Sequence, residues 1–191
     1  MLAFALAIFT SAFLLFQIQP LIAKFILPWF GGGTAVWGVS MLFFQTCLVA
    51  GYAYAHLLVH YLKVRQQAIV HLVLLTLALT QLPVSPASTF EPNAAADPTL
   101  QILLLLARTI GIPFFVLSAT APLIQAWVSR TQAVSNPYRL YALSNAASLL
   151  ALLSYPFLVE PLMTRQTQVM LWSGIFAVFL TVCAFCAYST G

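Results

Sequence analysis

The sequence predicts an all-α integral membrane protein. Charged residues make up 5% of its 191 residues and hydrophobic residues 62%, whereas a soluble domain carries about 25% charged residues. Its mean hydropathy is +1.00, which also excludes an intrinsically disordered chain. A membrane β-barrel would alternate apolar and polar residues in segments of about ten, but the apolar residues here follow one another without alternation. The remaining class is a helical bundle in a lipid bilayer.

Six apolar segments account for the chain as one membrane domain over residues 1–191, because crossing the hydrocarbon core takes roughly 20 residues. The first is a span rather than a cleaved signal peptide, since no charge precedes Lys24 and the apolar run is too long. A polar stretch over 84–98 forms an outer loop. The expected spans are Leu2–Pro28, Ala35–Tyr61, Gln67–Pro83, a span within Thr99–Val128, Tyr138–Val159 and Thr167–Tyr188.

The charges in the connecting loops predict the orientation of these spans. Basic residues without acids follow the second and fourth spans, while acids without bases follow the third. The positive-inside rule therefore places both termini and both basic loops in the cytoplasm. The residues concerned are Lys63 and Arg65, then Arg130 and Arg139, then Glu91 and Asp97, with Glu160 and Arg165 following the fifth span.

The fourth segment admits two interpretations. In one, a single tilted helix carries Arg108 within the membrane. In the other, which we favour, Gly111 and Pro113 separate an interfacial helix at 99–108 from a span at 110–128. The second interpretation leaves Arg108 at the outer interface, near Glu91, Asp97 or Glu160, because a cation in lipid is costly.

Polar residues within spans are the candidate site residues, since each is costly at membrane depth. Gln17, Gln19 and Lys24 flank Pro20, whose ring frees a backbone carbonyl. They form either a polar site at a broken helix or, as we favour, a kink with interhelical hydrogen bonds and Lys24 reaching the interface. Gln45 and Gln125 are expected in interhelical hydrogen bonds, and Asn145 in a closely packed small-residue face with Ser144, Ser148, Ala147 and Ala151.

The histidines and cysteines are the remaining candidates for chemistry. A symmetric hairpin of the second and third spans would bring His56 level with His71. A bis-histidine haem or metal site is one interpretation, but a hydrogen bond across the hairpin without metal fits better, because no acid lies nearby to orient the rings. Cys183 and Cys186 have a C-x-x-C spacing inside an apolar span, where cysteine is commonly a small hydrophobe. No cofactor is expected.

Three stretches resemble a known family. They are residues 17–54, which contain QIQPLIAKFILPWFGGG, residues 112–130, which contain LSATAPLIQAW, and residues 136–161, which contain NPYRLYALSNAAS. Together they resemble the membrane domain of bacterial fused major-facilitator/spermidine-synthase proteins. The resemblance implies a six-helix, half-facilitator-like unit in the inner membrane, which in that family precedes an aminopropyltransferase-like domain. The residues Gly31–Thr34 look like a cofactor loop but lack a preceding strand, so they predict a bend between helices.

Three functions follow from these observations. The first is a transporter-like membrane unit, working with a second copy or another subunit and handling an unknown substrate, polyamines being the class that the family name suggests. The second is an accessory or scaffold subunit of a larger membrane complex. The third is the membrane anchor of an aminopropyltransferase-like enzyme, although the chain itself offers no catalytic pair of residues. Without a basic cluster, nucleic acid is not an expected partner.

Overall fold

A computed structural model describes residues 1–86, 92–93, 96–131 and 138–190, and over these residues the chain is helical, with no strand. The helices are α1 (Leu2–Phe30), α2 (Thr34–Tyr61), α3 (Val64–Ala78), α4 (Pro98–Thr131), α5 (Tyr138–Ser154), α6 (Glu160–Leu162) and α7 (Arg165–Thr190). A 3₁₀ turn at Leu79–Gln81 extends α3, and a π-helical turn at Tyr155–Val159 joins α5 to α6.

Five of these segments are long and apolar enough to cross a membrane, as expected of a multi-pass helical membrane protein. They are α1, α2, α4, α7 and the continuous run of α5 through α6, over Tyr138–Leu162. The predicted third span is the exception, because α3 has 15 residues and a span needs roughly 20.

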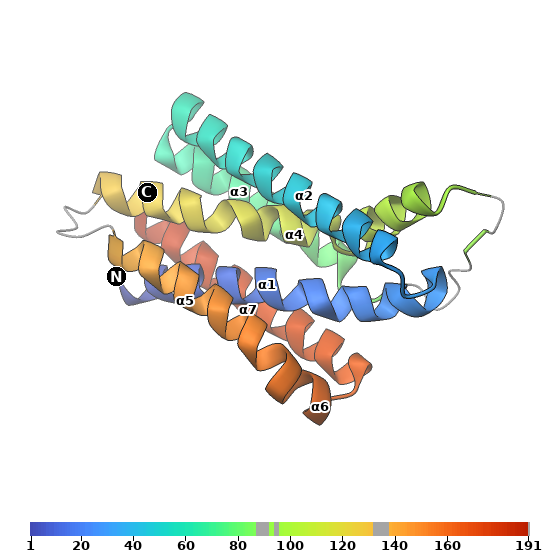
Figure 1. Cartoon of the computed structure of the whole chain (residues 1–191). Helices are drawn as coiled ribbons and strands as arrows, with labels where there is room; N and C mark the ends of the chain where they lie inside the picture. The colour runs from blue at the N-terminus through green and yellow to red at the C-terminus, as the bar shows by residue number, and fades with distance from the viewer. Residues whose placement is uncertain (87–91, 94–95, 132–137, 191) are drawn as a thin grey trace.

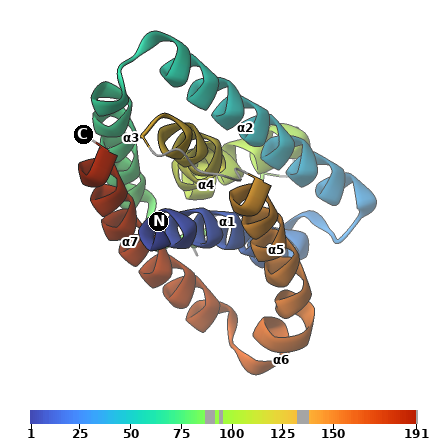
Figure 2. The same cartoon turned by 90° about the vertical axis from the view of Figure 1, so that its left-hand side faces the viewer.

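Two antiparallel helices, α1 and α4, form the centre of the bundle and pack against each other. They are also the most buried of the five long helices. In Figure 2, α2 and α3 flank α4, while α5 and α7 flank α1. Figure 1 shows both termini and the α2–α3 turn at one end of the bundle, and the α1–α2 turn at the other. The basic residues Lys63 and Arg65 thus share an end with the termini.

The most extensive helix contacts are symmetric under an exchange of α1 with α4, α2 with α5, and α3 with α7, although α1 also packs on α2 without an equally extensive contact of α4 with α5. Under that exchange the packing of α2 on α4 corresponds to that of α5 on α1, and the packing of α3 on α4 to that of α7 on α1. The same exchange leaves two contacts unchanged, that of α1 with α4 and that of α3 with α7. The two central helices also share a Pro-Leu-Ile tripeptide, at Pro20–Ile22 and Pro122–Ile124. The bundle therefore consists of two similar three-helix units.

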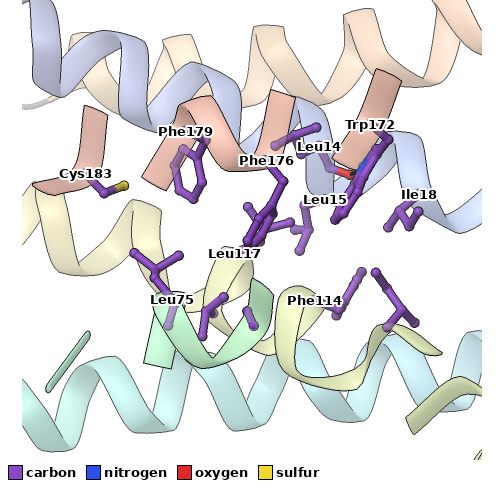
Figure 3. Close-up of a cluster of buried hydrophobic side chains, with 14 of the residues drawn as sticks. Leu14, Leu15, Ile18, Leu75, Phe114, Leu117, Trp172, Phe176, Phe179 and Cys183 are labelled. Carbon is purple, nitrogen blue, oxygen red and sulfur yellow. Dashed lines mark hydrogen bonds between the residues drawn. The ribbon is translucent and has the colours of Figure 1, made fainter. Parts of the chain in front are cut away.

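The core lies where α1, α3, α4 and α7 meet. Figure 3 shows Phe176 and Phe179 of α7 pointing toward Leu117 of α4, with Leu75 of α3 and Leu15 of α1 beside them. All five side chains are buried. Trp172 of α7 lies in the same cluster and donates its indole N–H to the carbonyl oxygen of Leu14, at 3.0 Å. Apolar packing and this bond hold the two three-helix units together.

The glycine segment after α1 is a bend, which confirms the interpretation of Gly31–Thr34. Gly31 has a φ of 72°, a left-handed conformation that glycine adopts without steric cost. Its N–H donates to the carbonyl oxygen of Leu27 and ends the helix. The chain then reverses direction into α2.

The favoured division of the fourth segment into two helices is wrong, because α4 is one helix of 34 residues. At 1.5 Å per residue it is roughly 50 Å long, far beyond a hydrocarbon core of about 30 Å. Pro113 lies inside this helix, and a side chain from another element bonds backbone groups beside it. The Gln81 amide donates to the carbonyl oxygen of Ala107 at 3.2 Å and accepts from the N–H of Ile112 at 3.0 Å.

Candidate functional site

A groove between α2 and α5, with α1 as its floor, gathers three of the predicted polar residues. We call it the α1–α2–α5 groove. It has a volume of about 590 Å³. Gln19 and Lys24 line it from α1, Gln45 from α2 and Glu160 from α6. Its other lining residues are mostly apolar or aromatic, namely Phe16, Pro20, Ala23, Leu27, Trp37, Ser40, Met41, Phe44, Leu152, Tyr155 and Pro156.

The charged end of this groove is built by an ion pair between Lys24 and Glu160. The Lys24 ammonium also lies 5.7 Å from the ring centroid of Tyr155, in cation–π contact. Both charged side chains remain partly exposed, at 32% and 44%. Arg165 donates to the backbone carbonyl of Lys24 at 3.4 Å but does not line the groove. The groove therefore contains one cation and one anion, each able to exchange its partner for a ligand.

The rim of the groove is apolar. Trp37 and Met41 of α2 and Leu152 of α5 line it and are each more than 40% exposed. Such a rim faces either lipid or another apolar helix, since exposed apolar side chains favour both over water. A ligand thus approaches the ion pair along an apolar surface.

A second cavity, of about 210 Å³, lies on the other side of α1, between α1, the π-helical turn at Tyr155–Val159 and α7. Gln17 lines it, and the Gln17 Oε1 atom is buried and has no hydrogen-bond partner among the described residues. Tyr155 lines both this cavity and the groove, and its hydroxyl donates to the Oε1 atom of Gln168 at 3.2 Å. The residues around Pro20 thus separate into two places: Gln17 faces the second cavity, while Gln19 and Lys24 face the groove.

Two glutamines that the sequence analysis did not single out hold equivalent positions in the two units. The Gln67 amide, near the start of α3, donates to the carbonyl of Leu62, five residues earlier, at 2.8 Å. The Gln168 amide, near the start of α7, donates to the carbonyl of Met163, also five residues earlier, at 2.9 Å. The Oε1 atom of Gln67 accepts from the Trp127 indole at 2.9 Å, as that of Gln168 accepts from Tyr155.

The predicted pair of His56 and His71 is wrong. His56 is exposed on α2 and stacks on His60, with ring centroids 6.2 Å apart. His71 is buried, and its Nε2 atom lies 3.1 Å from the Thr120 hydroxyl of α4. That hydroxyl donates to the Val116 carbonyl, so it accepts from His71. The pairing fails because α2 and α3 do not form a closely packed hairpin: α4 packs against both of them.

The other predicted polar residues do not join a shared site. Arg108 is exposed on α4. Of its three expected partners, Glu160 pairs with Lys24, and Glu91 lies outside the described residues. Asp97 instead accepts hydrogen bonds at the start of α4, from the N–H of Thr99 at 2.7 Å and more weakly from that of Leu100. The bonds from Thr99 lower the pKa of Asp97 below its usual value.

The remaining side chains serve mainly in packing. Within the described part of the chain, Gln45 and Gln125 have no hydrogen-bond partner, so the interhelical bonds expected of them are not formed. Asn145 is exposed, while Ala147 and Ala151 on the same helix are fully buried where α5 packs on α1. The two alanines therefore pack against α1 as expected, whereas Asn145 lies outside that packed face. Cys183 is buried in the core shown in Figure 3.

Comparisons with known proteins identify no protein similar to this chain. No protein-family model matches the chain, and no curated protein or solved structure matches it significantly. The class of protein is therefore defined by the fold alone: a bundle with five helices long and apolar enough to cross a membrane.

Proposed function

We propose that the chain is a transporter-like unit of the bacterial inner membrane that holds its substrate in the α1–α2–α5 groove. The observation that carries the proposal is the groove itself, in which Gln19, Lys24, Gln45 and Glu160 converge beside Pro20 of α1. Polar residues at membrane depth are retained mainly where they have a function. Discontinuous or bent helices with polar groups are the usual construction of transporter binding sites.

The symmetry of the bundle supports the same proposal. Units of three helices with inverted topology occur within each half of a major-facilitator transporter, and α1–α3 and α4–α7 correspond in their packing. Because α7 crosses the membrane in this arrangement, its counterpart α3 is the sixth span, completed by the 3₁₀ turn at Leu79–Gln81. The resemblance to the membrane domain of fused major-facilitator/spermidine-synthase proteins points to the same half-facilitator-like unit.

A half-facilitator works against a second half, so the groove needs a partner. The exposed apolar rim at Met41 and Leu152 is where a second copy of the chain, or a second bundle of the same kind, would close it. After gentle purification in mild detergent, we expect two copies of the chain to remain together, with twice the 20.9 kDa mass of one chain. In that pair, Met41→Cys is expected to form a disulfide between chains under mild oxidation.

Val178→Cys is the matched control for this experiment. Val178 is exposed on α7, which packs on α1 and α3 rather than beside the groove, so it should not cross-link. Co-purification in a stable complex with unrelated subunits would instead favour the accessory-subunit function. A single unpaired chain that cross-links at neither position would contradict the paired unit.

A further inference from the structure

We propose that the ligand of the α1–α2–α5 groove is a zwitterionic phospholipid with a primary ammonium, such as phosphatidylethanolamine. Its phosphate pairs with Lys24 and its ammonium with Glu160. The inference rests on the proposed function in taking the groove as a ligand site, and it adds the chemical class of the ligand.

The first reason is the charge of the groove. Lys24 and Glu160 pair with each other, so a ligand can enter the charged end only by providing a counter-charge to both. A zwitterion does so without changing the net charge of the site, to which Arg165 beside Lys24 adds a second positive charge. A polyamine would leave Lys24 beside additional positive charges, and an anionic lipid would leave Glu160 unpaired, both costly arrangements in a medium of low dielectric.

The second reason is the path to the site. The rim residues Trp37, Met41 and Leu152 are apolar and exposed, so the length of the groove favours an apolar ligand, while the partly exposed Lys24 and Glu160 at its end are open to a polar headgroup. A lipid enters from the hydrocarbon before a second chain covers the rim, and its acyl chains lie along apolar lining residues such as Phe16 and Phe44.

The third reason is the position of the charges at one end of a long apolar groove. The ion pair lies where α1 approaches α6, at the end of the bundle opposite both termini (Figure 1). A headgroup at that end and acyl chains along the remaining length match the amphipathic shape of a phospholipid. The Tyr155 ring, which now faces the Lys24 ammonium, is a second acceptor for a ligand ammonium.

Native mass spectrometry of the purified protein tests the inference. The protein is delipidated and exposed to equal amounts of phosphatidylethanolamine and phosphatidylglycerol with the same acyl chains. The wild type is expected to retain phosphatidylethanolamine in preference. Glu160→Gln removes the partner of the ammonium and leaves Lys24 unopposed, so the retained ratio should shift toward phosphatidylglycerol by roughly tenfold, the size of a lost charge-assisted hydrogen bond.

Two further variants separate charge recognition from simple unfolding. The exchange of charges, Lys24→Glu with Glu160→Lys, keeps the net charge of the site and should keep the preference for phosphatidylethanolamine. Arg108→Gln removes a cation outside the groove and should leave the ratio unchanged. A wild type that prefers phosphatidylglycerol or neither lipid, or a Glu160→Gln ratio within twofold of wild type, would overturn the inference. These outcomes leave the pairing measured by the Met41 cross-link unaffected, so the two proposals fail independently.

Discussion

Gly51→Ala is expected to destabilise the protein by about 1–3 kcal/mol, the usual cost of overpacking a close contact. A Cβ atom on Gly51 would overlap the Ser118 Oγ atom and lie 3.0 Å from the Ser118 Cβ and 3.1 Å from the Phe115 carbonyl oxygen. The Ser118 hydroxyl is itself held by the Phe115 carbonyl at 2.7 Å. Relief therefore requires α2 to move away from α4, the central helix against which it packs.

Gly38→Ala provides the control within the same helix, because a Cβ at Gly38 meets nothing within 4 Å. Alanine is the better helix former, so this variant should gain about 0.5–1 kcal/mol. Chemical unfolding in detergent, followed by circular dichroism, measures both changes. Adding Ser118→Gly to Gly51→Ala removes the clashing side chain and should restore part of the loss. Equal stability of the two alanine variants would show that α2 and α4 are not in close contact at Gly51.

Gln81→Leu should also be strongly destabilising, by about 1–3 kcal/mol for the backbone groups that it leaves unpaired. The amide of Gln81 bonds the carbonyl oxygen of Ala107 and the N–H of Ile112, next to Pro113 in α4. Leucine has a similar size but neither a donor nor an acceptor, so the effect isolates the hydrogen bonds.

Thr80→Val is the neighbouring control. The Thr80 hydroxyl bonds the Leu77 carbonyl within its own turn, and its loss should change stability by less than about 1 kcal/mol. Hydrogen exchange gives a local readout, because amides of α4 near Ile112 should exchange faster in Gln81→Leu than in Thr80→Val. Identical exchange in the two variants would mean that Gln81 does not stabilise this part of α4.

Much of the fold could be predicted because hydrophobic length is a local property of the sequence. The five long spans follow from the apolar runs, and the bend at Gly31 follows from its glycines. The continuity of α4 could not be predicted, because the partner that satisfies the backbone near Pro113 is Gln81, distant in sequence. The length of α3 was overestimated because hydropathy does not reveal where a helix changes to a 3₁₀ turn.

Three members of the candidate site could be predicted, but neither Glu160 nor the arrangement of the site could. Polarity within spans indicated Gln19, Lys24 and Gln45, yet nothing local indicated that Lys24 pairs with Glu160 across the bundle. The histidine pairing failed for the same reason, since the sequence suggests that consecutive spans are neighbours while α4 packs on both α2 and α3. Gln67 and Gln168 were missed because their equivalence appears only once the two three-helix units are compared.

The sidedness of single cysteines tests the central claim, that α3 crosses the membrane as the counterpart of α7. In a background with Cys47, Cys183 and Cys186 replaced by alanine, cysteines at Lys63 and Pro92 flank α3 and its extension. In intact cells, a membrane-impermeant maleimide should label the cysteine at position 92, and the cysteine at 63 should react only after the membrane is opened. Labelling of both positions from the same side would contradict the two-unit bundle.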